Sequence, residues 1–413
     1  MSEVFEKAKK VKVASEQLKL STTEEKNIAL SLIAKALSQR KDEILKNNQI
    51  DVKQARNNGL KESLIDRLFL NEKRLEEMID CCDRIEQFDD PIGSVISSWK
   101  SKGLRISKVR VPIGAIGIIY ESRPNVTVET VILSLKAGNS ILLRGGRDAL
   151  RTNIAIVEAL KKGLENSSIP DYTVEIIEDT NRELVHEMLH LNEFLSLIIP
   201  RGGHSLIKFV TENSAVPVLE TGVGNCHIFV DESANLEKSV EVIDNAKTQR
   251  PGTCNAVEKV LVHKNISNIF LPLLFERLKG KNVEVRGCKR TCEIIKAFPA
   301  NNDDWGEEYL DYILAIKIVD SIEDAITHIL RYSSGHSEAI LTENIRSADK
   351  FAGNIDSAAV YINASTRFTD GGQFGFGGEM GISTQKLHAR GPIGLEELTS
   401  YKYVIIGNYE VRG

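Results

Sequence analysis

The sequence predicts an α/β fold with two doubly wound domains of parallel sheet and a small additional β element. Short apolar runs alternate with helical patterns along most of the chain, as in strand–helix–strand units. This series begins twice, once near residue 111 and again after Asp231. The length of 413 residues also suits two or three domains, at about 150 residues for each domain.

Residues 1–97 show helical patterns rather than strand patterns. The stretch "STTEEKNIALSLIAKAL" places Ser and Thr N-cap candidates before glutamates that can complete a capping box. Ile28, Leu32 and Leu37 then recur near the helical period, which predicts a helix with one face packed on a core.

Residues 98–110 predict a β-hairpin that stands apart from the α/β series. Polar and apolar residues alternate in "SSWKSKGLRISKVRV", and Lys102-Gly103 supplies a turn at its centre. Residues 399–413 contain a terminal strand, "YKYVIIG". We expect this strand to pair with the hairpin and to form an oligomerisation arm, because an exposed edge strand can pair with another subunit.

The two strand series divide the remaining chain into two domains. We expect residues 1–97 and 111–225 to form the first domain, rejoined by about residues 385–398, and residues 226–384 to form the second. The strands expected in the first series are "GAIGIIY", "SILLR", "TVEII", "FLSLIIP" and "CHIFVD". Those of the second are "KVLVH", "ILAIKIV", "EAILT" and "AAVYIN".

Composition and charge exclude several classes of partner. Hydrophobic residues make up 42% and charged residues 27%, which is ordinary for a globular protein. The net charge of −5 gives no basic field for nucleic acid or anionic lipid. The N-terminus lacks the apolar region of a secretory signal, and "VPIGAIGIIY" is far shorter than the ~20 residues of a membrane span. We therefore expect a cytoplasmic protein without nucleic-acid or membrane partners.

One cysteine lies in a turn that presents it. "QRPGTCNAVE" places Cys254 behind a Pro-Gly pair and Arg250, so its thiol is either a small apolar filler or a nucleophile. Six cysteines in this chain do not make a disulfide framework. We expect the other five to be inert thiols in a reducing compartment: Cys81, Cys82, Cys226, Cys288 and Cys292.

The stretch "HEMLH", from His186 to His190, matches the pattern in which two histidines bind zinc and a glutamate activates water. Its neighbours, however, indicate an amphipathic helix between two strands, and no glycine turn with a third histidine follows. We expect no metal here, although a non-catalytic metal-binding or scaffold protein remains an alternative.

Phosphate-binding motifs are weak in this chain. Neither the P-loop pattern nor G-x-G-x-x-G is present. In "IIPRGGH", Gly202 and Gly203 follow a strand and open a helical run, so their amides suit a pyrophosphate. By themselves, Asn125 in "ESRPNVTVET" indicates a helix cap and Glu220 in "VLETGVGNC" a solvated carboxylate.

Taken together, the order of these residues along the chain resembles the order found in the aldehyde dehydrogenase superfamily. Asn125 after a strand, a basic residue at Arg147, Glu220, Cys254 and then Glu308 follow the superfamily's course. "HSEAILTEN", "AAVYINAS", "GFGGEMGIS" and "GLEELTSYKYV" continue it to the end of the chain. The resemblance implies an aldehyde dehydrogenase-like fold.

One branch of the superfamily is especially similar. "VPIGAIGIIYESRPNVT", "LRGG", "ETGVGNCH", "QRPGTCNA" and "FGFGGEMGIST" resemble the branch that reduces L-gamma-glutamyl 5-phosphate with NADPH in proline biosynthesis. The resemblance implies NADP(H) as cofactor, with Arg147 where the branch commonly has lysine. CoA-acylating or hydrolytic relatives would share Cys254, Asn125 and Glu308 and remain alternatives.

The resemblance also implies roles for individual residues. Cys254 would be the nucleophile, Asn125 an oxyanion donor and Glu220 a proton-transfer group. The expected cofactor residues are Arg147, Gly202, Gly203 and Glu308, and the expected substrate residues are Arg123, Arg250, Ser365, Thr366 and Arg367. As partners we expect the small-molecule substrate, further copies of the chain in a dimer or tetramer, and functional coupling to glutamate 5-kinase.

Overall fold

The computed structural model describes residues 2–121 and 123–412 as two compact units. Unit 1 contains the N-terminal part of the chain through Thr221, together with residues 375–381 and 393–413. Unit 2 contains residues 222–374 and 382–392. The chain therefore passes from unit 1 to unit 2 four residues earlier than the boundary expected after residue 225. Instead of one segment at about residues 385–398, two segments rejoin unit 1, and residues 382–392 between them belong to unit 2.

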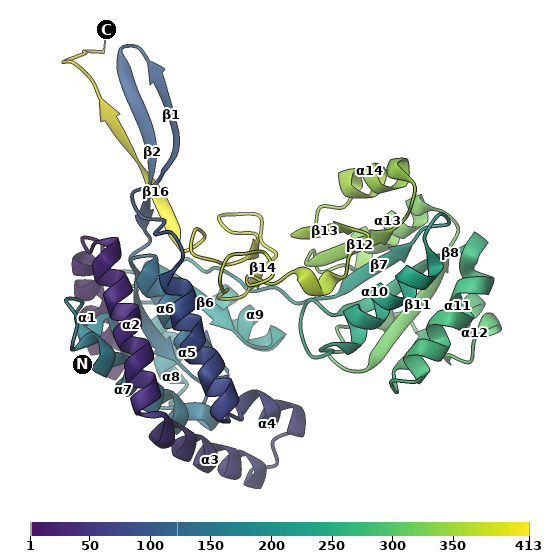
Figure 1. The fold of residues 1–413 in the computed structure, drawn as a ribbon, viewed down its shortest axis with the longest axis horizontal. Helices are drawn as coiled ribbons and strands as arrows, with labels where there is room; N and C mark the ends of the chain where they lie inside the picture. Colours follow the sequence, from purple (N-terminus) through teal and green to yellow (C-terminus); the bar gives the residue numbers. More distant parts are fainter. Residues whose placement is uncertain (1, 122, 413) are drawn as a thin grey trace. The chain divides into compact units, whose positions relative to one another are not determined.

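Unit 1 contains a parallel sheet with the strand order β5-β4-β3-β6, whose edge strand β6 is labelled in Figure 1. The strands are β3 (Ala115–Tyr120), β4 (Ser140–Arg144), β5 (Val174–Ile176) and β6 (Leu197–Arg201). The helices are α1 (Glu3–Leu18), α2 (Thr23–Gln39), α3 (Lys41–Asn57), α4 (Glu62–Leu68), α5 (Glu72–Glu86), α6 (Pro124–Lys136), α7 (Leu150–Leu164), α8 (Glu183–Leu189) and α9 (His204–Asn213), with the 3-10 helices η1 (Arg147–Ala149) and η2 (Asp171–Thr173).

Both faces of this sheet are covered because its central strand is apolar on both sides. Ala115 and Ile119 of β3 pack with residues of α1, α8 and α9 in one core cluster. Ile116 and Ile118 point to the opposite face by the two-residue repeat of a strand, and they are equally buried. Helix α6, which contacts β3 and β4, belongs to that second layer.

Helix α2 begins where the sequence places a cap. Thr22 is the N-cap, and Glu25 completes the capping box. The expected apolar stripe was wrong in one detail, because Ile28 is exposed whereas the neighbouring Leu30 and Ile33 are buried. The packed face of the helix is therefore rotated from the predicted one.

Unit 2 contains a seven-stranded parallel sheet with the order β10-β9-β11-β8-β7-β12-β13. Its strands are β7 (Cys226–Val230), β8 (Val257–His263), β9 (Glu284–Gly287), β10 (Phe298–Pro299), β11 (Ile313–Val319), β12 (Ser337–Leu341) and β13 (Ala359–Ile362). Its helices are α10 (Leu236–Thr248), α11 (Lys264–Lys279), α12 (Lys289–Ile294), α13 (Ile322–Tyr332) and α14 (Ile345–Asn354), with η3 (Asp303–Trp305) and η4 (Thr366–Phe368), and a short pair of strands, β14 (Ile382–Ser383) and β15 (Gly391–Pro392), completes it.

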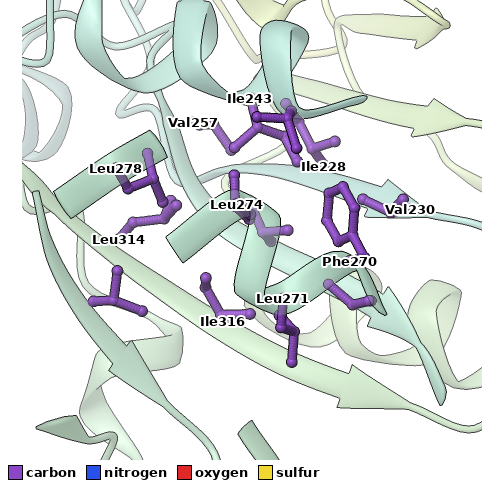
Figure 2. Packing of buried hydrophobic residues seen from close by; sticks show 14 of the residues in the cluster. Ile228, Val230, Ile243, Val257, Phe270, Leu271, Leu274, Leu278, Leu314 and Ile316 are labelled. Carbon is purple, nitrogen blue, oxygen red and sulfur yellow. The ribbon is translucent and has the colours of Figure 1, made fainter. Parts of the chain in front are cut away.

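Alternate residues of the central strands supply two separate cores in unit 2. Ile228 and Val230 of β7 pack with side chains of α10 and α11, of which Figure 2 shows Phe270 and Leu274. Phe229, between them in sequence, packs instead with residues of α13 and α14. Helices on both faces make this a doubly wound sheet, which confirms the predicted fold class.

A third sheet, of three antiparallel strands, belongs to unit 1. It has the order β1-β2-β16, with β1 (Val95–Ser101), β2 (Leu104–Pro112) and β16 (Thr399–Ile406). Lys102 and Gly103 form the hairpin turn, and both have positive φ, as a two-residue turn of this kind requires. The terminal strand pairs with the hairpin as the sequence predicts.

Candidate active site

Cys254 lies in a turn that joins α10 to β8, and we call residues 249–256 the Cys254 turn. The thiol-bearing residue is half-buried, whereas every residue of β8 that follows is buried. Burial raises the pKa of Cys81 to about 11 and that of Cys226 well above its usual value. Those two thiols are therefore poor sources of thiolate near neutral pH.

The backbone of Gly224 lies directly against the backbone of Cys254. A Cβ atom built on Gly224 would lie 1.5 Å from the Cys254 carbonyl oxygen and 2.6 Å from its Cα. Only glycine fits at this position, because main-chain atoms cannot move aside as the end of a side chain can. The main-chain N–H of Gly224 also donates to Glu308 Oε1 at 2.7 Å, so one residue touches both Cys254 and Glu308.

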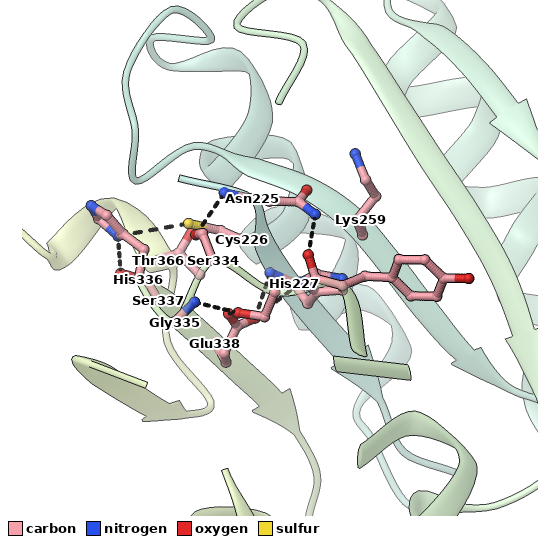
Figure 3. Close-up of polar contacts among 12 residues, drawn as sticks. Asn225, Cys226, His227, Lys259, Ser334, Gly335, His336, Ser337, Glu338 and Thr366 are labelled. Atoms are coloured by element: carbon pink, nitrogen blue, oxygen red, sulfur yellow. Dashed lines mark hydrogen bonds and ion pairs between the residues drawn. The ribbon is translucent and has the colours of Figure 1, made fainter. Parts of the chain in front are cut away.

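Cys226 and His336 belong to a cluster of buried polar contacts (Figure 3). The Cys226 thiol donates to the Cys254 carbonyl oxygen, with 3.1 Å between sulfur and oxygen. The same thiol lies 3.8 Å from His336 Nδ1, and burial lowers the pKa of His336 to about 4. His336 is therefore a neutral ring at physiological pH. No motif in the sequence indicated a role for this histidine.

Residues 365–367, at the start of η4, include two that form hydrogen bonds with the Cys254 turn. Arg367 donates to Thr253 Oγ1 at 3.1 Å and to Asn255 Oδ1, and Thr366 donates to the Asn255 carbonyl oxygen at 2.7 Å. Thr366 is fully buried, and Ser365 is nearly so. Two of the expected substrate residues, Thr366 and Arg367, thus contact the Cys254 turn.

Arg250 is exposed at the start of the same turn. Its carbonyl oxygen accepts from Thr253 Oγ1 at 2.9 Å, which closes the turn across Pro251 and Gly252. The expected role of Arg250 as an anion anchor stays a prediction.

The loop that carries Glu308, residues 306–311, is fixed by two consecutive side chains of β8. Lys259 Nζ donates to the Glu307 carbonyl oxygen at 2.7 Å, and Glu258 Oε1 accepts from the Leu310 N–H at 3.2 Å. Both side chains are fully buried, and burial shifts the pKa of each to about 7, upward for Glu258 and downward for Lys259. Their acid–base pattern, "VEKVLV", is ordinary for a strand, so sequence reasoning missed them.

In unit 1, Asn125 lies in the first turn of α6, where Arg123 is the N-cap and Pro124 the first helical residue. Its side-chain N–H donates to Glu129 Oε1 at 3.1 Å. Asn125 is therefore not the helix cap that the isolated motif indicates, because it lies inside the helix and its amide bonds a side chain one turn on. Glu220 is half-buried, directly before the end of unit 1's main segment.

The expected cofactor residues of unit 1 follow the carboxyl ends of its parallel strands. Arg147 is exposed in η1 after β4, and Gly202 and Gly203 follow β6. This edge is where open α/β sheets bind ligands. Gly203 is the N-cap of α9, and its N–H donates to Glu121 Oε2 at 3.1 Å, so this amide already binds an anionic oxygen. A helix N-terminus suits the phosphates of a dinucleotide.

The "HEMLH" residues lie on α8 and its C-cap and have other partners. Glu187 accepts a hydrogen bond from Ser2, and His190 Nδ1 lies 2.8 Å from the carbonyl oxygen of His186. Among residues 2–121 and 123–412, no group of three acidic, histidine or cysteine side chains is placed to hold a metal ion.

The model of the aldehyde dehydrogenase family matches residues 1–287 and 280–404. The chain belongs to the aldehyde dehydrogenase family. Within this family, it is 63% identical over 413 residues to a gamma-glutamyl phosphate reductase of Kosmotoga olearia, with all of both chains covered. A crystal structure of gamma-glutamyl phosphate reductase from Thermotoga maritima is 62% identical and superposes with a TM-score of 0.97, covering 100% of both chains.

A more distant relative is also a gamma-glutamyl phosphate reductase. The structure of gamma-glutamyl phosphate reductase from Saccharomyces cerevisiae is 30% identical, with a TM-score of 0.56 over 100% of this chain and 99% of that one. This aldehyde dehydrogenase family member therefore belongs to the gamma-glutamyl phosphate reductase branch, which confirms the resemblance found in its motifs.

Proposed function

We propose that this enzyme reduces L-gamma-glutamyl 5-phosphate to L-glutamate 5-semialdehyde and phosphate, the second step of proline biosynthesis from glutamate. The observation that carries the proposal is the full-length identity of 62–63% to relatives named gamma-glutamyl phosphate reductase. The half-buried Cys254, in a turn held by surrounding main-chain and side-chain contacts, supplies a nucleophile for this chemistry.

In the proposed reaction, the Cys254 thiolate attacks the acyl carbon of the substrate. The carbon–oxygen bond to phosphate breaks, phosphate leaves with the bonding electrons, and a thioester forms on the sulfur. Asn125 and the N–H of Cys254 are the proposed donors to the oxyanion, and loss of one such donor typically costs about 3 kcal/mol of barrier. Reduction gives a thiohemiacetal, which releases the aldehyde and returns the thiol, and we assign Glu220 to the proton transfers.

NADPH is the proposed cofactor, and when bound it supplies the hydride for the thioester. The exposed Arg147 would meet the adenosine 2′-phosphate, since a guanidinium can bind phosphate through two N–H groups. Gly202 and Gly203 would donate main-chain N–H groups to the pyrophosphate, as Gly203 does to Glu121. We assign Glu308 to the nicotinamide ribose, because its carboxylate is held on Gly224 beside Cys254.

The substrate carries a phosphate and an amino acid end, so it needs cationic partners. We propose Arg123 and Arg250 for these groups, because they flank Asn125 and Cys254 in the chain. Ser365 and Thr366 are buried behind the Cys254 turn, so in our proposal they shape the site from within.

We also propose homo-oligomerisation through the sheet β1-β2-β16, together with functional coupling to glutamate 5-kinase. Trp99, Tyr403 and Ile405 are exposed on this sheet. All six cysteines are free thiols, which fits the cytoplasmic location that the sequence predicts. In the described ranges 2–121 and 123–412, no helix has both the length and the apolar character for crossing a membrane.

Phosphate dependence tests the proposed reaction in its reverse, oxidative direction. With glutamate semialdehyde and NADP⁺, we expect NADPH to form only when inorganic phosphate is added, because phosphate must release the acyl group from Cys254. NADPH formation that requires CoA instead of phosphate, or that proceeds with water alone, would contradict the assignment. The measurement is absorbance of NADPH with each acyl acceptor added separately.

Replacement of the nucleophile tests the role of Cys254. We expect Cys254→Ala to abolish turnover without a loss of folding, because the half-buried thiol is not part of a hydrophobic core. Cys292→Ala is the matched control, since Cys292 is also a half-buried cysteine of unit 2. Turnover and thermal unfolding are measured for both variants, and activity retained in Cys254→Ala refutes the assigned nucleophile.

A further inference from the structure

The guanidinium of Arg367 is bonded to the Cys254 turn at three side chains. Arg367 Nη1 donates to Thr253 Oγ1 at 3.1 Å and to Asn255 Oδ1, and Arg367 Nε donates to Gln249 Oε1 at 3.0 Å. Thr253 and Asn255 are the residues directly before and after Cys254. A single cation therefore holds both neighbours of the sulfur-bearing residue.

The acceptors on the turn are themselves fixed. Asn255 is 4% exposed, its side-chain N–H donates to the Thr369 carbonyl oxygen at 2.9 Å, and its own carbonyl accepts from Thr366. Thr253 Oγ1 lies 2.9 Å from Asn255 Oδ1, which links the two flanking residues across Cys254. The Arg367 guanidinium completes this arrangement as a permanent charge with a rigid, planar set of donors.

We propose that Arg367 is a positioning residue for the nucleophile: it holds Thr253 and Asn255 so that the Cys254 sulfur stays aimed at the acyl carbon. This inference rests on the proposed role of Cys254. It differs from the sequence-based expectation, in which Arg367 binds an anionic group of the substrate.

The physical reason is the conformational freedom of a turn that contains Gly252. A turn without such cross-links samples several arrangements, and a misplacement of about 1 Å at a reacting atom can cost on the order of 100-fold in rate. A positioning role therefore predicts a loss in kcat, whereas a substrate-binding role predicts a rise in KM.

The first experiment compares Arg367→Gln and Arg367→Lys with the parent enzyme. For Arg367→Gln, we expect kcat to fall roughly 10- to 100-fold while KM for phosphate and for glutamate semialdehyde changes by less than about threefold. Lysine keeps the charge but lacks the rigid, planar donor geometry of the guanidinium, so Arg367→Lys should restore only part of kcat. Arg346→Gln, which removes an exposed arginine from α14 of the same unit, is the matched control and should change neither constant.

The second experiment probes the free enzyme without substrate. The rate at which iodoacetamide alkylates Cys254 is followed between about pH 6 and pH 9 and assigned by peptide mass spectrometry, since thiolate fraction and access set this rate. We expect the pH–rate profile of Arg367→Gln to differ from that of the parent, while Arg346→Gln follows the parent. The alkylation rate reports on the Cys254 turn without any turnover. It therefore tests the positioning role separately from the proposed function, which would be refuted if Cys254→Ala retained turnover.

A double-mutant cycle provides the third test. Asn255→Ala should reproduce the loss in kcat, and Arg367→Gln combined with Asn255→Ala should be no worse than the more damaged single variant, because both break the same contact. Thr253→Ala removes one acceptor of Arg367 and leaves the arginine in place. It therefore replaces the Arg367 variants in this test if those variants fail to fold. A raised KM for phosphate or aldehyde, with kcat and alkylation unchanged, would overturn the proposal, as would additive losses in the cycle.

Discussion

The main chain of Cys254 is closely packed by residues of the loop before β7 and of β7 itself. Gly224 is in contact with the Cys254 carbonyl, and the Cys226 thiol bonds to that same oxygen. The position of Cys254, the proposed nucleophile, thus depends on β7 and on the loop before it, as well as on its own turn.

Gly224→Ala tests this dependence. We expect a loss of activity on the order of 100-fold, because the added methyl must displace the Cys254 main chain by at least about 1 Å. We also expect stability to fall by about 1–3 kcal/mol, as for other overpacked buried sites. The measurements are kcat and the free energy of unfolding in denaturant.

Gly353→Ala is the control for this substitution. Gly353 lies in α14, and a Cβ there meets no atom within 4 Å. Alanine should therefore leave activity unchanged and raise stability by up to about 1 kcal/mol through helix propensity. Equal behaviour of the two glycine variants would contradict the packing argument.

At the scale of elements, the sheet β1-β2-β16 is the one most exposed to solvent. Trp99, Tyr403 and Ile405 are 44%, 53% and 56% exposed, and Trp99 packs edge-on against Tyr403 with ring centroids 6.1 Å apart. An apolar strand surface of this kind favours pairing with another chain.

Ile405→Glu tests whether this sheet joins subunits. We expect the oligomer to dissociate to a lower state because a carboxylate would be buried at the interface without a partner. Sedimentation velocity measures the change. Leu387→Glu is the control, since Leu387 is an apolar residue that is 81% exposed outside this sheet. A parent protein that sediments as a monomer, or an unchanged oligomer in Ile405→Glu, would contradict the prediction.

At the scale of the whole molecule, buried histidines link stability to pH. Burial lowers the pKa of His336 to about 4 and that of His328 to about 3, against an ordinary value of 6.5. At pH values between each folded-state pKa and 6.5, the unfolded chain therefore binds more protons than the folded chain. The stability from each neutral ring is complete above the ordinary pKa and is lost as pH falls through the folded-state pKa.

His336→Asn tests this linkage. The free energy of unfolding of the parent should fall as pH decreases from 6.5 towards 4, by up to about 1.4 kcal/mol per pH unit for each such histidine. The variant should be less stable at neutral pH and show a shallower acid slope, because one of the two histidines is gone. Denaturant unfolding at several pH values measures both effects.

The control for the pH series is His204→Asn. His204 is exposed at the start of α9, so its replacement should leave the slope unchanged. An acid slope that is the same in His336→Asn and in the parent would show that His336 does not set it.

The periodicity of the sequence located most strands of the two parallel sheets, including the three-residue β5, but it missed β9 and β10 and the antiparallel pair β14 and β15. β10, β14 and β15 each contain two residues, and β9 contains four, so little repeat can develop in them. The sequence also placed "CHIFVD" in the first series, whereas this strand, β7, lies in the sheet of unit 2. In α2 the cap was among the predicted candidates, because capping depends on adjacent residues, but the buried face was rotated. The packing partners of that helix come from distant parts of the chain.

The sequence by itself determined the α/β class, the hairpin and the family, and it singled out Cys254 as the cysteine behind a Pro-Gly pair. These depend on the order of residues and on local backbone preferences. Only the tertiary structure decided which side chains meet. Arg367 and Asn255 are 112 positions apart, and the order β8-β7-β12-β13 brings their segments together. Periodicity shows which face of a strand is buried, but it carries no information about which distant segment covers that face.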